Sequence, residues 1–150
     1  MAPRTVRHTR ADVLARAEAE YRALDRIVSR LRPDDFDRPV FGDWTVKDAL
    51  AHIVAWKAET LRQLRGQRRK PGEALPVNER NQLIFDAWHG RPAVTLVAEH
   101  RRVQRELRAQ VRALPDEYFT GRERSPLWPD NLLGHSAAHR RRHLEEVFER

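Results

Sequence analysis

Three of the chain's seven histidines, His135, His139 and His143, lie four residues apart near its end. Residues four apart in a helix lie on one slowly turning strip, so these imidazoles share a face if the segment is helical. On a helical wheel His143 falls inside the apolar face, His139 at its edge and His135 further toward solvent. A His-x-x-x-His pair is a standard way for one helix to supply two metal ligands. The spacing therefore indicates a metal site at His139 and His143.

A metal inside a helical bundle also needs a ligand from a facing helix. His52 lies beside the main apolar stripe of its own segment, next to Ala49 and Trp56. Three neutral imidazoles leave one coordination position open, which is the pattern of catalytic rather than structural zinc sites. We therefore predict His52, His139 and His143 as metal ligands. Zinc or nickel is the expected ion, because both suit ligation by nitrogen alone.

The histidines also have an interpretation without a metal, because a histidine pair on a basic helix is often only polar surface. If the metal site exists, Glu59 or Glu146 is a candidate to orient a ligand ring. His100 occupies an apolar seam and is expected to be a hydrogen-bonded core residue. His8 and His89 are expected in terminal or loop positions and have no inferred role.

Four amphipathic segments are expected to position these residues. In each of them apolar residues recur at three- and four-residue steps, which is typical of a helix with one buried stripe. Capping boxes or prolines mark most of the starts, and glycine or proline most of the ends. The expected helices lie within residues 9–33, 45–66, 92–115 and from Pro129 or Asp130 onward, with a short helix within 78–90. No stretch is a convincing strand, so the sequence predicts an all-α four-helix bundle.

The connection at residues 66–92 is long for a helical bundle. A helix of about 20 residues spans roughly 30 Å, and this connection can run back over that distance. The second and third long helices are therefore expected to point the same way, giving an up-down-down-up bundle whose crossover carries the short helix. The length of 150 residues fits one domain, residues 1–150.

Composition excludes several classes of protein. The chain has no cysteine, which removes disulfides, thiolate nucleophiles and cysteine-type zinc sites. The N-terminal residues have no apolar run typical of a signal peptide, and no segment approaches the roughly 20 apolar residues that span a bilayer. We expect a soluble cytoplasmic protein with no membrane partner.

The net charge of +7 raises the alternative of nucleic-acid binding. Basic runs occur within residues 62–70, 101–112 and 140–142. Glutamates interleave in the second run, no DNA-reading motif is visible, and aromatic residues do not alternate with the charge. A solvated basic face is the favoured interpretation, and nucleic acid is considered an unlikely partner.

The segment 41–56, Phe-Gly-Asp-Trp-Thr-Val-Lys-Asp-Ala-Leu-Ala-His-Ile-Val-Ala-Trp, resembles the helix-2 signature of the DinB-like superfamily. It is most similar to the ClbS/DfsB branch, which typically reads Gly-x-Trp-Ser/Thr-x-Lys-Asp-x-x-Ala-His-x-x-x-Trp. The start at residues 10–24, the asparagine-bearing short helix and the closing His-x-x-x-His also resemble that branch. The resemblance covers nearly the whole chain.

This resemblance implies the same up-down-down-up fold and a metal triad that maps onto His52, His139 and His143. Two positions depart from the branch pattern. Arg140 stands where an aromatic often follows the first histidine of the last helix, and His135 stands where an asparagine is usual. Arg140 also falls near the middle of the predicted apolar face, where a charge is costly unless it is paired.

Members of the superfamily are thought to be thiol-dependent S-transferases and isomerases that use low-molecular-weight thiols such as mycothiol or bacillithiol. The ClbS branch is associated with hydrolytic resistance to an electrophilic genotoxin. The resemblance thus implies a metal-dependent transferase or hydrolase for small electrophiles, serving detoxification or stress resistance, with a thiol as the expected co-substrate of a transferase. His135 is then a candidate proton shuttle, and Trp44 and Trp56 are expected to line the pocket, although a tryptophan near a helix start more often only packs in the core.

The main alternative is a non-catalytic bundle that sequesters a toxic small molecule. It needs the pocket but no exchangeable water, so it predicts a protective effect that survives loss of the metal ligands. Relatives of this kind often form homodimers, which leaves a homodimer open here.

Overall fold

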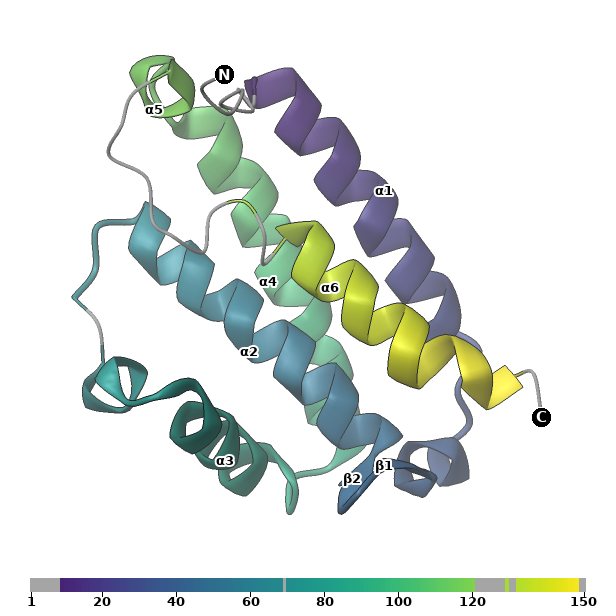
Figure 1. Ribbon diagram of the computed structural model, residues 1–150. Coiled ribbons are helices and arrows are strands. Elements are labelled where there is room, and N and C mark those ends of the chain that lie inside the picture. The colour runs from purple at the N-terminus through teal and green to yellow at the C-terminus, as the bar shows by residue number, and fades with distance from the viewer. Residues whose placement is uncertain (1–8, 69, 121–128, 130–131, 149–150) are drawn as a thin grey trace, which may run out of the picture.

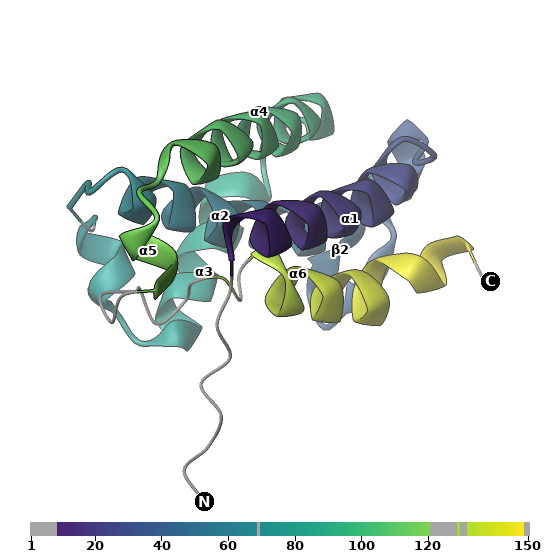
Figure 2. The same ribbon diagram turned by 90° about the horizontal axis from the view of Figure 1, so that it is seen from above.

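The computed structural model describes residues 9–68, 70–120, 129 and 132–148. Four helical segments pack together as a bundle: α1 (Arg10–Val28), α2 (Val46–Leu64), α4 (Ala93–Ala113) and a C-terminal segment that begins with α6 (Gly134–His139). In Figure 1, α2 and α4 run in one direction and α1 and α6 in the other. Seen from above, α4 and α6 lie on opposite sides of the pair formed by α1 and α2 (Figure 2). The predicted all-α bundle is confirmed.

Side-chain caps begin the first two helices where the sequence predicts them. The Thr9 hydroxyl accepts a hydrogen bond from the Asp12 backbone N–H at 3.0 Å. Asp48 accepts from the backbone N–H of Thr45 at 2.9 Å, while the Thr45 hydroxyl accepts from the Asp48 N–H at 3.3 Å. This reciprocal pair satisfies donors that the helix itself leaves free.

The core fills the space between the four long helical segments. Its largest fully buried side chains include Leu24, Leu50, Ile53, Leu96 and Leu144. Leu50 and Ile53 belong to α2, the only one of these segments that contacts both α4 and α6 extensively. Among the described residues, no helix is long and apolar enough to cross a membrane.

The connection between α2 and α4 contains the short helix α3 (Val77–Trp88), which starts close to the predicted position. It packs beside α2 (Figure 1) but contains no fully buried residue. Polar contacts hold it: Arg80 pairs with Glu59, and the Trp56 indole N–H donates to Asn81 Oδ1 at 3.2 Å. The turn that follows α3 is held by Lys47, which donates to the carbonyl oxygens of His89 and Arg91 at 2.6 and 2.8 Å.

The prediction that the chain has no strand is wrong at one place. Strands β1 (Pro39–Phe41) and β2 (Trp44–Thr45) form an antiparallel hairpin before α2. Gly42 turns the chain with a φ of 49°, which glycine adopts without strain. Strands of three and two residues are too short to show the alternation by which a sequence reveals a strand. The hairpin sets Phe41 and Trp44 beside the N-terminal end of α2.

The predicted start of the last helix, at Pro129 or Asp130, is also wrong. The described helix begins at Gly134, and residues 130 and 131 lie outside the described part of the chain. Residues Arg140–Leu144 form a wider π-helical turn, in which the Glu145 N–H donates to the Arg140 carbonyl, and a 3₁₀ turn follows at Glu145–Phe148. Another short helix, α5 (Glu117–Thr120), follows α4. The π-turn changes the rotation per residue, so a wheel drawn for an α-helix misplaces residues beyond His139.

Candidate metal centre

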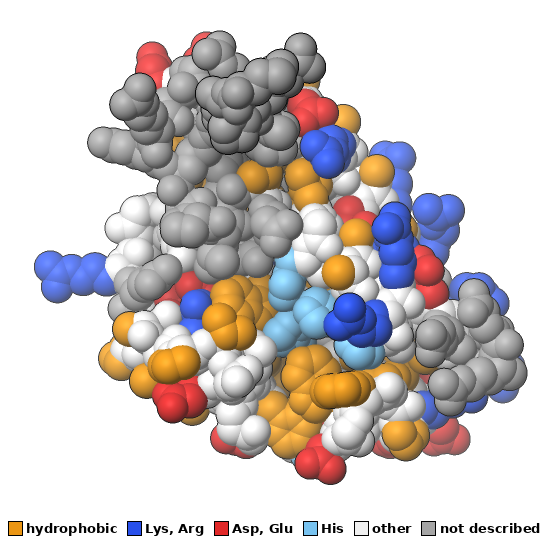
Figure 3. All heavy atoms as spheres, viewed as in Figure 1, with side chains coloured by type: hydrophobic (Ala, Val, Ile, Leu, Met, Phe, Trp, Pro, Cys, Tyr) orange, Lys and Arg blue, Asp and Glu red, His pale blue; other side chains and the backbone are white. Residues whose placement is uncertain are grey.

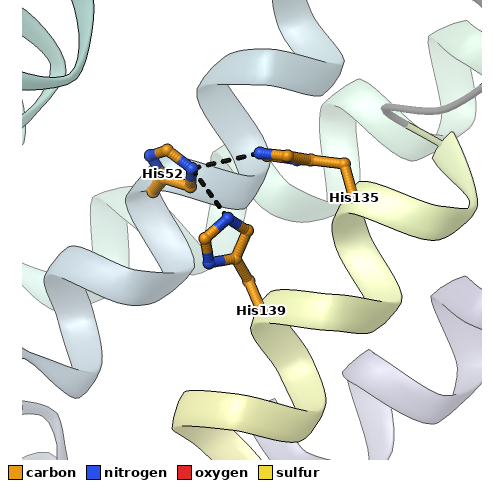
Figure 4. A group of neighbouring side chains, drawn as sticks. All are labelled: His52, His135 and His139. Atoms are coloured by element: carbon orange, nitrogen blue, oxygen red, sulfur yellow. Dashed lines mark hydrogen bonds between the residues drawn. The ribbon is translucent and has the colours of Figure 1, made fainter. Parts of the chain in front are cut away.

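Three histidines from two facing helices point their ring nitrogens at one another (Figure 4). His52 Nε2, on α2, lies 3.1 Å from Nε2 of His135 and 3.1 Å from Nε2 of His139, both on α6. The ligand atoms of all three lie within 4.8 Å of one another. His52 is buried, and the other two are half-buried. This is the only group of three or more metal-ligating side chains found among the described residues.

The separation of these nitrogens fits a bound metal ion. Nitrogen ligands about 2.0–2.1 Å from a tetrahedral zinc stand roughly 3.3 Å apart, close to the 3.1 Å observed. Hydrogen bonds between the rings explain the contacts less well. The Nε2 of a neutral imidazole either donates one proton or accepts through one lone pair, so His52 Nε2 serves two partners poorly.

His143 lies next to this group but outside it. Its ring stacks on that of His139 with centroids 5.6 Å apart, and it lies 5.9 Å from the ring of Phe41 and 6.3 Å from that of Trp44. Only 7% of His143 is exposed. The structure therefore gathers His135, rather than His143, with His52 and His139, and the role of His143 as a ligand stays a prediction.

A buried ion pair fixes the face that α6 turns toward α2. Glu20 of α1 accepts hydrogen bonds from Arg140, at 2.7 Å to Nε and 2.8 Å to Nη2, and from the Ser136 hydroxyl at 3.2 Å. Ser136 and Arg140 directly follow His135 and His139 in the chain. Anchoring both to one carboxylate sets the rotation of the helix and thereby aims the two histidines at His52. We call this arrangement the Glu20 clamp.

The Glu20 clamp also offsets the free-energy cost of burying the Arg140 charge on the apolar face. Arg140 and Glu20 are each only 8% exposed, and Arg140 is paired with Glu145 as well. The pKa of Arg140 is raised by its hydrogen bonds to Glu20, so it remains charged. The expectation that this arginine must be paired is confirmed.

Among the described residues, aromatic rings rather than carboxylates surround the histidine group. His52 lies between Trp44 and Trp56, with ring centroids at 5.1 and 6.1 Å, and Trp56 also contacts His135 at 5.6 Å. The Nδ1 atoms of the three clustered histidines are buried without a hydrogen-bond partner among the described residues. Glu59, a candidate to orient a ligand ring, instead binds Arg80 and Gln63. The side chain of Glu146, the other candidate, lies outside the described part of the structure.

The histidine group forms one wall of a pocket of about 500 Å³. The described residues that line it are Phe41, Trp44, His52, Trp56, Val77, Asn81, His135, His139, Arg142 and His143. In Figure 3 the histidines are visible from outside, bordered by hydrophobic side chains on one side and by a basic side chain on the other. A small molecule can thus reach the histidines. The sequence did not predict Phe41, Val77 or Arg142 as pocket residues, because they come together only through the hairpin, the crossover and the last helical segment.

Burial keeps the clustered imidazoles neutral. It lowers the pKa of His52 to about 3, and those of His135 and His139 to about 4 each, with repulsion from neighbouring cationic groups adding to the effect. Metal ligation requires the unprotonated ring, so all three are in the correct state at neutral pH.

Two histidines outside the cluster have other partners. His100 is 2% exposed, stacks on Tyr21 and lies 3.2 Å from Asp25 Oδ1, which confirms the predicted hydrogen-bonded core histidine. Burial lowers its pKa to about 4. His89, which has no role inferred from sequence, caps α3 and lies 3.0 Å from both carboxylate oxygens of Asp48. His8 lies outside the described residues.

These lowered pKa values predict acid sensitivity of the metal-free protein. Below about pH 6.5 the unfolded chain takes up protons that the folded chain refuses until about pH 3–4, so the free energy of unfolding falls as pH falls through that window. His52 and His100 each contribute at most about 1.4 kcal/mol per pH unit. Denaturant titrations of chelator-treated, dialysed protein between pH 7.5 and 4.5 measure this. A flat profile, or one unchanged in His100→Gln, contradicts it.

Comparison with known proteins agrees with this architecture. A family model described as the DinB superfamily matches residues 16–147. A crystal structure of a protein from Streptococcus pneumoniae is similar with a TM-score of 0.77 and 16% identity, covering 97% of this chain and 93% of that one. An uncharacterised protein from Escherichia coli UTI89 is similar with a TM-score of 0.72 and 17% identity, over 91% and 94% of the two chains. No curated protein matches the chain. Likenesses at these identities show the fold alone.

A further similar structure is that of the colibactin self-resistance protein ClbS in complex with a double-stranded DNA. Its TM-score is 0.69 at 13% identity, over 97% of this chain and 96% of that one. The expectation that nucleic acid is an unlikely partner is therefore not supported by this neighbour, which does bind DNA. At 13% identity the similarity to ClbS shows a shared fold and does not show that this chain binds DNA.

Proposed function

Because the chain belongs to the DinB superfamily, we propose that it is a metal-dependent protein that acts on small electrophilic molecules. The metal is a divalent ion, zinc or nickel, held by His52, His135 and His139. The observation that supports this most is the convergence of three neutral ring nitrogens from two helices at the wall of an open pocket. An all-nitrogen donor set suits these two ions better than it suits iron or manganese.

The pocket supplies the other parts that such chemistry needs. A divalent ion held by these three histidines would lower the pKa of water or of a thiol and so would supply a nucleophile near neutral pH. Trp44 and Trp56 cover two sides of the histidine group and limit the access of solvent. His143 lines the same pocket and is the group to accept or donate a proton there. This assignment exchanges the roles that the sequence predicted for His135 and His143.

The reaction follows from the nucleophile that enters the pocket. A low-molecular-weight thiol makes the protein an S-transferase, and water makes it a hydrolase. Either activity would consume reactive electrophiles, in keeping with a role in detoxification or stress resistance. In the alternative, a non-catalytic sequestering protein, the same pocket holds the molecule without turnover.

The deciding experiment is elemental analysis of protein purified without chelator and then loaded with zinc or with nickel, for the parent and for His135→Ala and His143→Ala. These two substitutions are matched in type and lie on the same helical segment. About one ion per chain in the parent and in His143→Ala, with loss in His135→Ala, supports the proposed ligands. Loss in His143→Ala with retention in His135→Ala restores the set predicted from sequence. No ion in the parent after loading refutes the metal-dependent function.

Binding of double-stranded DNA is a second candidate function, raised by the ClbS complex. The arginines of α4 weaken it, because Arg101, Arg102 and Arg108 are already paired with acidic residues. Such pairing reduces the positive charge left for phosphates. Duplex binding near physiological ionic strength, with a steep dependence on salt, would support this function.

A further inference from the structure

The histidine pocket has one fixed charge among its described lining residues, and that charge is positive. Arg142 is exposed and has no hydrogen-bond or ion-pair partner in the described part of the chain, unlike the neighbouring Arg140. No aspartate or glutamate belongs to the described lining. An unpaired guanidinium beside a pocket attracts an anionic ligand, most strongly where carboxylates are absent.

Two residues of the pocket also offer hydrogen-bond donors to a ligand. Asn81 uses its carbonyl oxygen to accept the Trp56 N–H, so its NH₂ group remains as a donor without a partner among the described residues. The guanidinium of Arg142 has donors only. Arg142 and Asn81 thus place hydrogen-bond donors at the same pocket, which matches a ligand rich in acceptor oxygens.

The rest of the lining is apolar and aromatic. Phe41 and Val77 are 63% and 57% exposed, so both offer apolar surface to a ligand. They lie at the same pocket as Trp44 and Trp56, where flat rings pack well against a flat ligand.

We infer that this pocket selects small molecules that carry a carboxylate on a planar apolar body, with Arg142 and Asn81 receiving the carboxylate. The inference deepens the proposed function and rests on it only in placing the substrate in this pocket. The planar body would lie against the apolar side chains of this lining, with the reactive centre next to the histidine group.

The test uses two probes of equal shape, 4-nitrobenzoate and the neutral 4-nitrobenzamide. Their affinities for the metal-free protein are measured at low salt and pH 7.5 by quenching of tryptophan fluorescence. Metal is removed beforehand, so that a carboxylate bound directly to an ion does not enter the result. The parent is expected to bind the carboxylate about five- to tenfold more tightly than the amide.

Two neighbouring arginines give a matched pair of variants. Arg142→Gln is expected to abolish the preference, whereas Arg141→Gln, which removes the same charge from an exposed residue outside the lining, is expected to retain it. Equal affinities in the parent, no detectable binding of the carboxylate, or an unchanged preference in Arg142→Gln overturns the inference. A separate zinc titration of the parent tests the proposed metal centre, so the two ideas can fail independently.

Discussion

Replacing Arg140 by methionine is expected to lower the free energy of unfolding by about 3–5 kcal/mol. Methionine keeps much of the length of the side chain but leaves the Glu20 carboxylate, 8% exposed, without the guanidinium that donates two hydrogen bonds to it. Only the Ser136 hydroxyl remains among the three hydrogen bonds that the structure gives this carboxylate. Guanidinium denaturation of the parent and the variant at pH 7 measures the difference.

Two further variants separate the charge from the packing. Glu20→Gln combined with Arg140→Met removes both charges of this ion pair and should recover a large part of the loss. Arg141→Met, at an exposed position next in the chain, should change stability by about 0.5 kcal/mol at most. A loss below about 1 kcal/mol in Arg140→Met contradicts the importance given to the Glu20 clamp. Weaker zinc binding by Arg140→Met, with every proposed ligand present, would show that the clamp aims the histidines.

Zinc is expected to raise the free energy of unfolding of the parent by about 2.7 kcal/mol at a free concentration a hundred times the dissociation constant. The reason is that the unfolded chain does not hold His52 of α2 near the two histidines of α6. His52→Phe keeps a planar ring beside Trp44 and Trp56 but removes the nitrogen ligand, so zinc should no longer stabilise it. Thermal unfolding at several zinc concentrations measures this stabilisation for the parent and for His52→Phe.

The control for this prediction is His89→Ala, which removes a histidine that lies outside the cluster, beside Asp48. It should respond to zinc as the parent does. An equal response of His52→Phe and the parent would place the zinc elsewhere on the chain and contradict the proposed centre.

Much of the fold follows from local patterns in the sequence. Thr9 and Thr45 predict the starts of α1 and α2 because the capping residues act within one turn of the chain. The hairpin at Phe41 and Trp44 could not be predicted, since its strands are too short to form a pattern. The start at Gly134 was missed because a proline at residue 129 suits a helix start without requiring one.

The site is less predictable than the helices that carry it. Residue type and spacing single out the histidines of α2 and of the last helical segment, but which of them lie together depends on long-range packing. The face of α6 that meets α2 depends on Glu20, more than 100 residues away in the chain, and the position of His143 depends on the π-turn at Arg140–Leu144. Neither leaves a periodic signal. Arg142 and Val77 join the pocket for the same reason, through long-range packing alone.

Helix α3 lines the pocket but contributes little to the buried core of the fold. It supplies Val77 and Asn81 to the pocket and yet no fully buried side chain to the core. Substitutions at Val77, which is 57% exposed, can therefore accumulate with little penalty in foldability, whereas Asn81 also accepts a hydrogen bond that holds α3 against α2. Descendants of such a chain can exchange one ligand preference for another by changing a single short helix, and a library randomised at Val77 should yield many folded variants.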